Sequence, residues 1–561
     1  MTRSRTTWAL VFILLLAFVL RFWQLDLKLL HHDEAVHSWF CYQFLTTGAW
    51  QYDPSYHGPF LYYVTTGMFA LIGPSDFAAR LLPALVGFAI IPLVYAVYRI
   101  GYIRENQMLV AALFIAISPD MVYFSRFLRH DIFMLFFTML LLVAILYYFE
   151  RGQTRFAVLA AVAAAGALCC KEEMPVIIII FAVFFAFSVW RGRFTLPLQW
   201  KADLMLAVIL VFAIMSVLYS AFFSHVDTLV GQNFSITTQG LNFKMNTTGW
   251  YQAIDHWTAM HNQQRLGGPM YFYIPLFLLY ELPIFILALI GTIQFMTTGL
   301  HPVRVVKKVR NWIRRRRYTL PAGDLAAITL QQIRDRKEAG GKSEEFFRFC
   351  IVWMIGTMAL YAFVGEKVPW LIIAQLLPMI FVATYRPGWQ KTAFVLAGCL
   401  FLLVVTWHVA FVPVDINEPI VQVQNSEDLR VVMGLMDNTS LVVIASEHYW
   451  PLPWYYRGDV WNKKIKFYGG ITDIGTITWN DPGMIILHDT ESYPSLEGYQ
   501  KKTYKLSYWF SFDDNKNRLP DYYLHRDGKM GSINIDVFTR LPAYAIPPNV
   551  ILSDKLPVNV T

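Results

Sequence analysis

The sequence has little charge for its length. Only 15% of its 561 residues are Asp, Glu, Lys or Arg, whereas an ordinary soluble domain contains roughly 25%. Hydrophobic residues make up 56% and aromatic residues 16%. They come in blocks about as long as a bilayer core is thick, roughly 20 residues for one helix. This composition excludes an ordinary soluble protein and predicts a polytopic integral membrane protein.

Cysteine is scarce as well. The chain has five cysteines, none of them after residue 399, and all lie in or beside apolar segments. No disulfide framework is therefore predicted. The net charge of +8 does not indicate nucleic-acid binding, because nearly all of the positive excess lies in short linkers between apolar blocks.

Eleven apolar blocks are candidate membrane spans. The first lies behind Arg3 and Arg5 and has no small-residue cleavage site, so we expect an uncleaved first span. The predicted spans are 8–25, 81–98, 108–124, 132–149, 155–169, 175–190, 204–223, 271–296, 347–364, 371–385 and 392–413.

Charge in the linkers predicts the orientation. With the N-terminus in the cytoplasm, every linker assigned to the inner side is basic, as the positive-inside rule requires. The longest inner linker, 297–346, contains the run Arg314 to Arg317, which predicts contact with anionic membrane lipids. We expect a multi-pass plasma-membrane protein with an extracytoplasmic C-terminal part and no nucleic-acid partner.

Two segments lie outside the spans. In the outer loop 26–80, Ala35 to Leu45 and Phe60 to Ile72 are too short to cross a bilayer and predict two interfacial helices. From residue 414, short apolar runs alternate with polar turns, and Glu427 to Met436 predicts a helix. The predicted fold is an all-α membrane domain, 1–413, followed by an extracytoplasmic α/β domain, 414–561.

The first outer loop contains the densest cluster of His, Asp and Glu residues. It reads His31-His32-Asp33-Glu34, with His37 one helical turn after Asp33. A carboxylate here is a candidate general base for an attacking hydroxyl. His31, Asp33 or Glu34, and His37 are alternatively candidate ligands of a divalent metal ion. Acidic residues that complement the dipole of a helix N-terminus are the structural alternative.

Other outer loops also carry charge. Asp131 follows Arg126, Arg129 and His130, so it is either a helix N-cap or part of an anion-binding corner. Two very short loops contain Lys171-Glu172 and Glu366-Lys367. Their lysines either extend toward the membrane surface or hold a lipid phosphate.

The ordered motifs resemble those of a known superfamily. Asp33-Glu34-Ala35, Tyr56 to Tyr63, Ala79 to Pro83, Leu128 to Phe133, Lys171-Glu172 and Glu366 to Trp370 resemble protein O-mannosyltransferases and lipid A aminoarabinose transferases. These are integral membrane glycosyltransferases with the C-type fold. The string from His31 to Ser38 is most similar to the prokaryotic, largely archaeal, family of flippase-activity-associated proteins of N-glycosylation pathways. Gly58-Pro59 departs from the Pro-Pro pair of those transferases.

The resemblance implies roles for individual residues. Asp33 matches the catalytic carboxylate that activates the acceptor in an inverting transfer from a polyprenyl-phosphate sugar to a glycan or protein. Glu34 and Asp131 match further acidic positions of the catalytic set. His57, Arg129, Lys171 and Lys367 are candidates for the donor phosphate, and the remaining site candidates are His31, His37, Glu172 and Glu366.

Two functions remain open on this evidence. A glycosyltransferase requires Asp33 as the base. A non-catalytic helper of polyprenyl-phosphate-sugar flipping requires the cations but not Asp33. An ordinary transporter finds little support, because no predicted span carries a buried charge at mid-depth.

Overall fold

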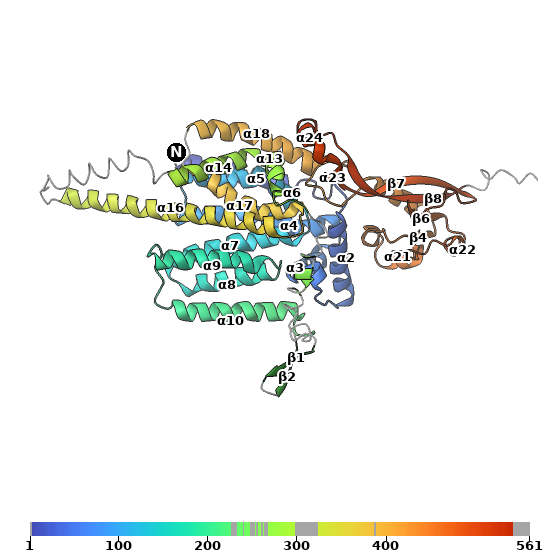
Figure 1. Cartoon of the computed structure of the whole chain (residues 1–561), viewed down its shortest axis with the longest axis horizontal. Helices are drawn as coiled ribbons and strands as arrows, with labels where there is room; N and C mark the ends of the chain where they lie inside the picture. Colours follow the sequence, from blue (N-terminus) through green and yellow to red (C-terminus); the bar gives the residue numbers. More distant parts are fainter. Residues whose placement is uncertain are drawn as a thin grey trace, which may run out of the picture.

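The computed structural model describes residues 3–225, 233–238, 241–246, 253, 256–259, 262, 268–297, 324–385 and 389–541, and gives the backbone alone for 3–4, 233–238, 241–246, 324–340 and 389–391. Long helices lie side by side in one bundle, and the β-rich part of the chain lies beyond one end of it (Figure 1). The N-terminus is at the other end (Figure 1). The N-terminus and the β-rich part therefore lie at opposite ends of the bundle, and the cytoplasmic N-terminus and extracytoplasmic C-terminal part stay predictions.

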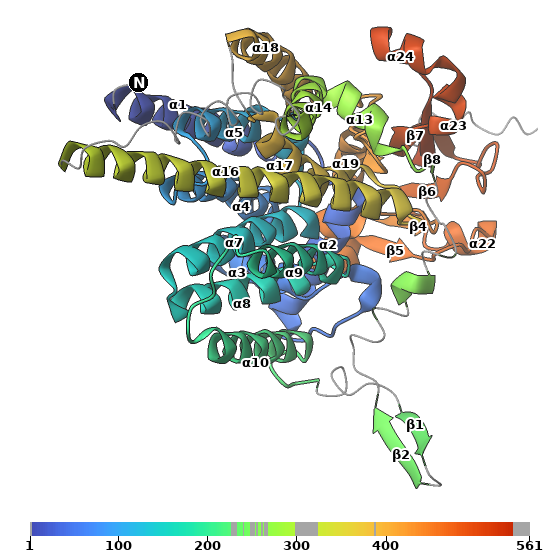
Figure 2. The same ribbon diagram turned by 60° about the vertical axis from the view of Figure 1, so that its left-hand side comes forward.

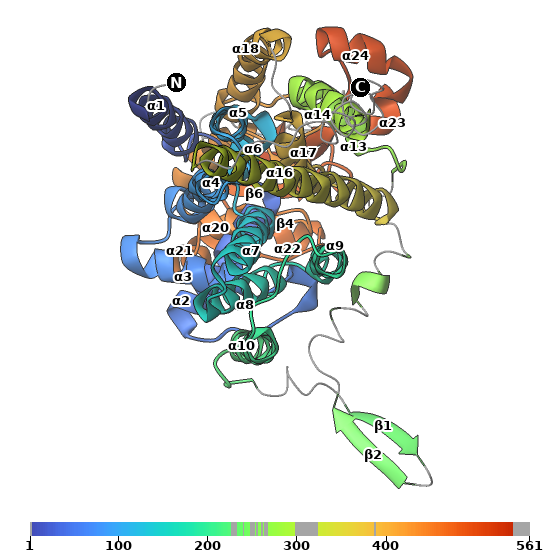
Figure 3. The same cartoon turned by 90° about the vertical axis from the view of Figure 1, so that its left-hand side faces the viewer.

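The bundle is built from helices in chain order. They are α1 (Arg3–Phe22), α2 (His32–Thr47), α3 (Phe60–Ile72), α4 (Asp76–Arg99), α5 (Glu105–Ile117), α6 (Pro119–Ser125), α7 (His130–Arg151), α8 (Thr154–Leu168), α9 (Met174–Trp190), α10 (Trp200–Tyr219), α13 (Tyr273–Tyr280), α14 (Leu282–Thr297), α16 (Asp324–Phe363), α17 (Ile372–Ala383) and α18 (Trp389–Phe411). Viewed from the N-terminal end, α7 is central, whereas α10 and α18 lie at opposite margins (Figure 3). Between α10 and α13 the described chain forms a hairpin of β1 (Asn233–Thr238) and β2 (Leu241–Asn246).

The predicted count of eleven spans is not confirmed. Among the described residues, six helices are long and apolar enough to cross a membrane, and two bent helix pairs raise the number to eight. The predicted spans 155–169, 175–190 and 371–385 are apolar helices, but each is shorter than 18 residues. The predicted interfacial helices are present as α2 and α3, and the basic run Arg314 to Arg317 lies outside the described residues.

Two of the predicted spans are bent for an identifiable reason. Helices α5 and α6 meet at 57°, and α13 and α14 meet at 112°. Ser118 is extended ahead of Pro119, because a residue before proline avoids the helical conformation. The buried Glu281 side chain, between α13 and α14, accepts hydrogen bonds from Ser118 Oγ at 2.5 Å and from Asp120 N at 3.1 Å, so the two bends are tied together. The prediction that no span carries a buried acidic or basic residue at mid-depth is therefore wrong for the span 271–296.

The C-terminal part is an α/β domain, as predicted. Its six-stranded sheet has the order β3-β7-β8-β6-β4-β5, in which β4 is parallel to β5 and β6 and the other pairs are antiparallel. The strands are β3 (Gln424–Asn425), β4 (Val442–Ala445), β5 (Ile465–Phe467), β6 (Met484–His488), β7 (Tyr499–Phe510) and β8 (Met530–Arg540). The helices are α19 (Asp428–Asp437), α20 (Leu452–Tyr455), α21 (Asp459–Lys464), α22 (Ile474–Ile477), α23 (Phe512–Asn515) and α24 (Leu519–His525). Helix α19 confirms the predicted helix to within one residue at each end.

Hydrogen bonds dock the α/β domain onto the outer loop. Trp454 Nε1 and Tyr455 Oη donate to the two carboxylate oxygens of Asp76 at 2.7 and 2.9 Å. Asn425 Nδ2 donates to the Leu30 carbonyl at 2.6 Å. Helix α2 packs against α20 of this domain, and Figure 2 shows α2 at the end of the bundle that faces the domain. The docked domain therefore covers the start of α2, where the sequence places its densest chemistry.

Candidate active site

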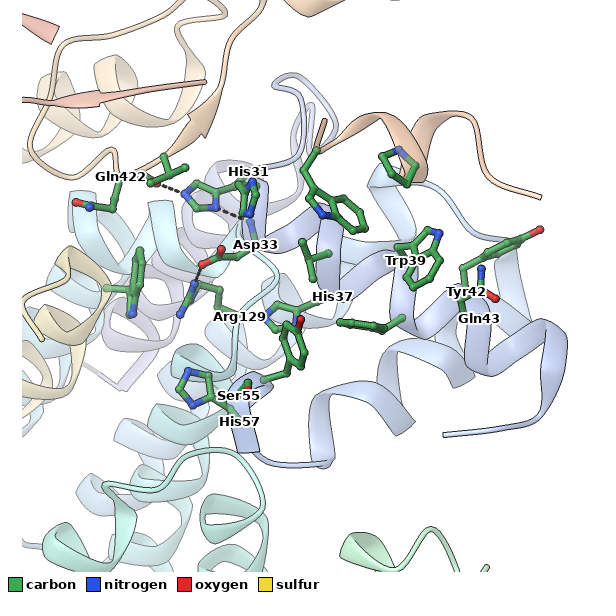
Figure 4. Close-up of a pocket in the computed structure, with 18 of the residues that line it drawn as sticks. His31, Asp33, His37, Trp39, Tyr42, Gln43, Ser55, His57, Arg129 and Gln422 are labelled. Carbon is green, nitrogen blue, oxygen red and sulfur yellow. Dashed lines mark hydrogen bonds and ion pairs between the residues drawn. The ribbon is translucent and has the colours of Figure 1, made fainter. Parts of the chain in front are cut away.

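A pocket of about 1170 Å³ lies between α2, the short outer loops and the α/β domain. Helix α2 lines it along most of its length, because Asp33, Val36, His37, Phe40 and Gln43 recur at a spacing of three or four residues. Figure 4 shows Asp33 facing Arg129 at one end and Trp39, Tyr42 and Gln43 farther along the same helix. The pocket therefore extends well beyond the predicted base.

The start of α2 is fixed by a capping box. The Nδ1 atom of His31 accepts a hydrogen bond from Asp33 N at 3.0 Å, and the Glu34 carboxylate accepts one from His31 N at 2.9 Å. Because Nδ1 accepts, the His31 ring carries its proton on Nε2, which donates to the Gln422 carbonyl. The helix-terminus alternative thus holds for His31 and Glu34.

Both carboxylate oxygens of Glu34 have hydrogen-bond partners outside the pocket. Its carboxylate binds Arg80 through Nε at 2.9 Å and Nη2 at 2.6 Å, and also accepts from Leu128 N at 2.8 Å. Both side chains of the ion pair are buried, and neither lines the pocket. Glu34 therefore positions α2 against α4 and the second outer loop, and the geometry gives it no contact with a reacting group.

Asp33 points the other way, into the pocket. Its side chain is 34% exposed and forms an ion pair with Arg129. Burial alone would raise the pKa of the Asp33 carboxyl, but Arg129 and the neighbouring histidines hold this pKa well below its usual range. The Arg129 guanidinium is in turn stacked over Trp370, with Cζ 3.7 Å from the ring centroid. Asp33 is therefore an ionised, oriented carboxylate at neutral pH.

A chain of alternating charges continues from Arg129. Its Nε lies 3.5 Å from Asp131 Oδ2, Lys171 Nζ lies 2.8 Å from Asp131 Oδ1, and Glu173 lies 3.1 Å from Lys171. Burial would lower the pKa of Lys171, but Asp131 and Glu173 raise it above its ordinary value. Asp131 is buried and does not line the pocket, whereas Arg129 and Lys171 do. Asp131 thus holds two cations at the pocket wall.

His57 and Glu172 form a second pair beside these cations. His57 Nδ1 lies 2.8 Å from Glu172 Oε2, and the imidazole stacks on Trp257 with the ring centroids 4.6 Å apart. A Cβ atom at Gly58 would collide with the Cys169 carbonyl. Glycine in place of the first proline of the Pro-Pro pair is therefore a steric requirement of this chain.

Lys367 and Arg126 do not reach the pocket. Lys367 Nζ donates to the carbonyls of Tyr361, Ala362 and Val364 at 2.5–2.8 Å, at the end of α16. Arg126 donates to carbonyls at the end of α1 and just after it. Both cations bind backbone carbonyls that a helix end leaves without partners. Of the pair Glu366-Lys367, Glu366 is the residue that lines the pocket.

The predicted metal ligands do not converge. His37 Nδ1 hydrogen-bonds Tyr62 Oη at 2.8 Å and makes no hydrogen bond to Asp33, and both ring nitrogens of His31 are engaged as described above. Burial lowers the pKa of His31 to about 4 and that of His37 to about 3, so both rings are neutral at neutral pH. Among the described residues, no three His, Cys, Asp or Glu side chains form a group that fits a metal ion.

Sequence reasoning missed several pocket residues. Glu173 directly follows the pair Lys171-Glu172, and Trp370 is the last residue of the motif Glu366 to Trp370. Their positions next to predicted site residues could therefore have indicated both. Trp257, Tyr361 and Gln422 come from distant segments, and nothing in their local sequence marks them. These residues line the pocket because the chain folds back on α2.

One family model matches part of the chain. Residues 56–219 match the family model described as dolichyl-phosphate-mannose-protein mannosyltransferase. A comparison with curated proteins gives no match.

The fold is similar to that of solved membrane proteins. ArnT from Cupriavidus metallidurans, bound to undecaprenyl phosphate, aligns with a TM-score of 0.53 at 13% identity, covering 95% of this chain and 98% of that one. The apo oligosaccharyltransferase of Archaeoglobus fulgidus aligns at 0.46 and 14% identity, covering 83% and 64%. The Pmt1-Pmt2 complex of S. cerevisiae aligns at 0.34 and 18% identity, covering 41% and 35%. The chain therefore has the predicted C-type fold of integral membrane glycosyltransferases, and its residues 56–219 are similar to one family of them.

Proposed function

We propose that this protein transfers a sugar from a polyprenyl-phosphate donor to an acceptor hydroxyl on the outer face of the membrane, with Asp33 as general base. The observation that carries the proposal is the position of Asp33. Of the three carboxylates predicted to be catalytic, it is the one that opens into the pocket, beside the buried cations Arg129 and Lys171. A shared fold with a protein that binds undecaprenyl phosphate supports a polyprenyl-phosphate donor.

The chemistry follows from this arrangement. The acceptor oxygen attacks the anomeric carbon while its proton passes to Asp33, and the bond from that carbon to the phosphate oxygen breaks. The leaving polyprenyl phosphate keeps the electron pair, so Arg129 and Lys171 stabilise the developing charge. Because a phosphate is already a good leaving group, no strong general acid is required. Attack opposite the leaving group inverts the anomeric configuration.

Donor binding also relieves a constraint on the base. In this structure the Asp33 carboxylate is paired with Arg129, which lowers its pKa and hence its strength as a base. A donor phosphate that binds Arg129 neutralises part of its positive charge. We therefore expect the pKa of Asp33 to rise toward its ordinary value once the donor is bound, when the base is needed.

The two loop lysines provide a direct test. Lys171→Met is expected to weaken binding of undecaprenyl phosphate by about tenfold or more, since a charge-assisted hydrogen bond contributes roughly 1.5–3 kcal/mol. Lys367→Met is the matched control, because Lys367 binds backbone carbonyls away from the pocket. Binding is measured on full-length protein in nanodiscs with radiolabelled lipid. Equal affinities of wild type and Lys171→Met would contradict the placement of the donor phosphate.

A further inference from the structure

The part of the pocket lined by the α/β domain differs in composition from the charged part around Asp33. Five aromatic side chains line it, one from α2 and four from the α/β domain, and we call them the aromatic wall: Trp39, Tyr449, Trp450, Trp461 and Phe467. Polar side chains lie among them in the same lining, namely Gln43, Asp459 and Asn462. The donor and the reacting groups at Asp33 do not account for this second surface.

The wall is one continuous row of rings across the domain boundary. Trp39 meets Trp450 with ring centroids 6.0 Å apart, and Trp450 lies 5.8 Å from Tyr449. Tyr449 then contacts Phe467 at 4.6 Å, and Phe467 contacts Trp461 at 6.2 Å. Tyr449 follows β4, and Phe467 ends the parallel strand β5. The carboxyl ends of parallel strands are a common ligand-binding edge, and here that edge borders the pocket.

The five rings of the aromatic wall are not an ordinary buried hydrophobic core. Phe467 is 40% exposed, and the other four members are partly buried. Aromatic surface left in contact with water is costly, and binding pockets typically combine such surface with a few polar groups. The Asp459 side chain is 84% exposed, and that of Asn462 is exposed as well. The wall therefore offers flat apolar faces with amide and carboxylate groups at their margins.

This combination matches a carbohydrate. A pyranose ring presents an apolar C–H face that packs on an aromatic ring, while its hydroxyls lie around the rim and bond to amide and carboxylate groups. A peptide that binds by pairing with a sheet edge is a poorer fit. Edge strand β5 has three residues, or roughly 10 Å at 3.3 Å per residue.

The distance to the base indicates the size of the ligand. Asp33 and the wall residue Trp39 both line the pocket and are six residues apart on α2, or roughly 9 Å at 1.5 Å per residue. Figure 4 shows this succession along the helix. A group that reacts at Asp33 and also covers the row of rings from Trp39 to Phe467 must extend beyond one sugar ring.

We propose that the acceptor is an oligosaccharide, whose already assembled part lies on the aromatic wall while its terminal hydroxyl meets Asp33. This inference rests on the proposed function and narrows its acceptor to a glycan. The docked α/β domain then selects the acceptor, and the membrane domain binds the donor.

An oligosaccharide array tests the proposal without donor and in the Asp33→Asn background, so the result does not depend on transfer. The array carries oligosaccharides of mannose, glucose, galactose and N-acetylglucosamine beside extended peptides, and is probed with full-length protein in labelled nanodiscs. We expect retention on oligosaccharides of two or more residues, and a loss of about tenfold or more in Trp450→Ala and Trp461→Ala. Trp461→Phe keeps an aromatic ring and should retain most of the binding.

Trp479→Ala is the matched control, because Trp479 is 68% exposed in the same domain and does not line the pocket. Unchanged binding of undecaprenyl phosphate by each wall variant confirms that it is folded. Retention on peptides rather than glycans, retention on no glycan, or equal retention by wild type and wall variants would each overturn the inference. Failure of sugar transfer with intact glycan retention would instead count against the proposed function alone.

Discussion

Replacing Asp33 by Asn is expected to lower the rate of sugar transfer by about 10³-fold, within the 10²–10⁴-fold range for loss of a general base. Asparagine has the same shape and still offers an oxygen to Arg129, but it cannot take the acceptor proton. Binding of undecaprenyl phosphate should persist, because Arg129 and Lys171 remain. Transfer is measured with radiolabelled polyprenyl-phosphate mannose and glucose on purified protein in nanodiscs.

Asp53→Asn is the matched control in the same outer loop. Asp53 is exposed, caps a short turn through Ser55 N at 2.8 Å, and does not line the pocket. It should therefore transfer sugar at the wild-type rate. Full activity in Asp33→Asn would show that another group accepts the proton.

The pH profile gives the same residue a second readout. The folded pKa of Asp33 lies below its usual value, so the basic, ionised form persists as pH falls through the ordinary range for Asp. Arg129→Gln removes the positive charge that holds this pKa down. The acid limb of kcat/KM is therefore expected to move to higher pH in Arg129→Gln, and an unmoved limb would mean that Asp33 does not set it.

Glu34→Gln is expected to lower the free energy of unfolding strongly. It removes the carboxylate that is paired with the buried Arg80 guanidinium, and breaking a buried ion pair typically costs about 3–5 kcal/mol. The free energy of unfolding is measured by denaturant titration in mixed micelles. Asp513→Asn is the control, because it removes an exposed ion pair with Lys516, which contributes little. A Glu34→Gln protein that is as stable as wild type and inactive would assign Glu34 to catalysis instead.

The two neighbouring carboxylates also show what the sequence could predict. Charge density does not separate Asp33 from Glu34, and the resemblance assigned the base to Asp33 but also placed Glu34 in the catalytic set. Successive helical residues point about 100° apart, so one faces the pocket and the other faces α4. Distinguishing them requires the position of Arg80, a partner 46 residues away in the chain.

The same limit applies to the lysines. Lys171 and Lys367 both occur in short charged outer loops, and their local sequences suit phosphate equally. Their roles differ because Asp131 directs Lys171 to the pocket wall, whereas the end of α16 engages Lys367. Helix periodicity and hydropathy predicted where the helices lie, since these are local properties. Pocket residues from the α/β domain depend on how that domain docks, which no local pattern encodes.

The central claim is that sugar leaves the lipid phosphate and joins an acceptor on this protein. The most direct measurement is a single-turnover assay in nanodiscs with donor labelled in both the sugar and the phosphate, supplied with a membrane-extracted glycan fraction. We expect equimolar formation of labelled glycan and free polyprenyl phosphate, with the anomeric configuration inverted. Donor that is bound, or moved across a vesicle bilayer, with its sugar-phosphate bond intact would contradict a transferase and assign the protein to transport of lipid-linked sugar.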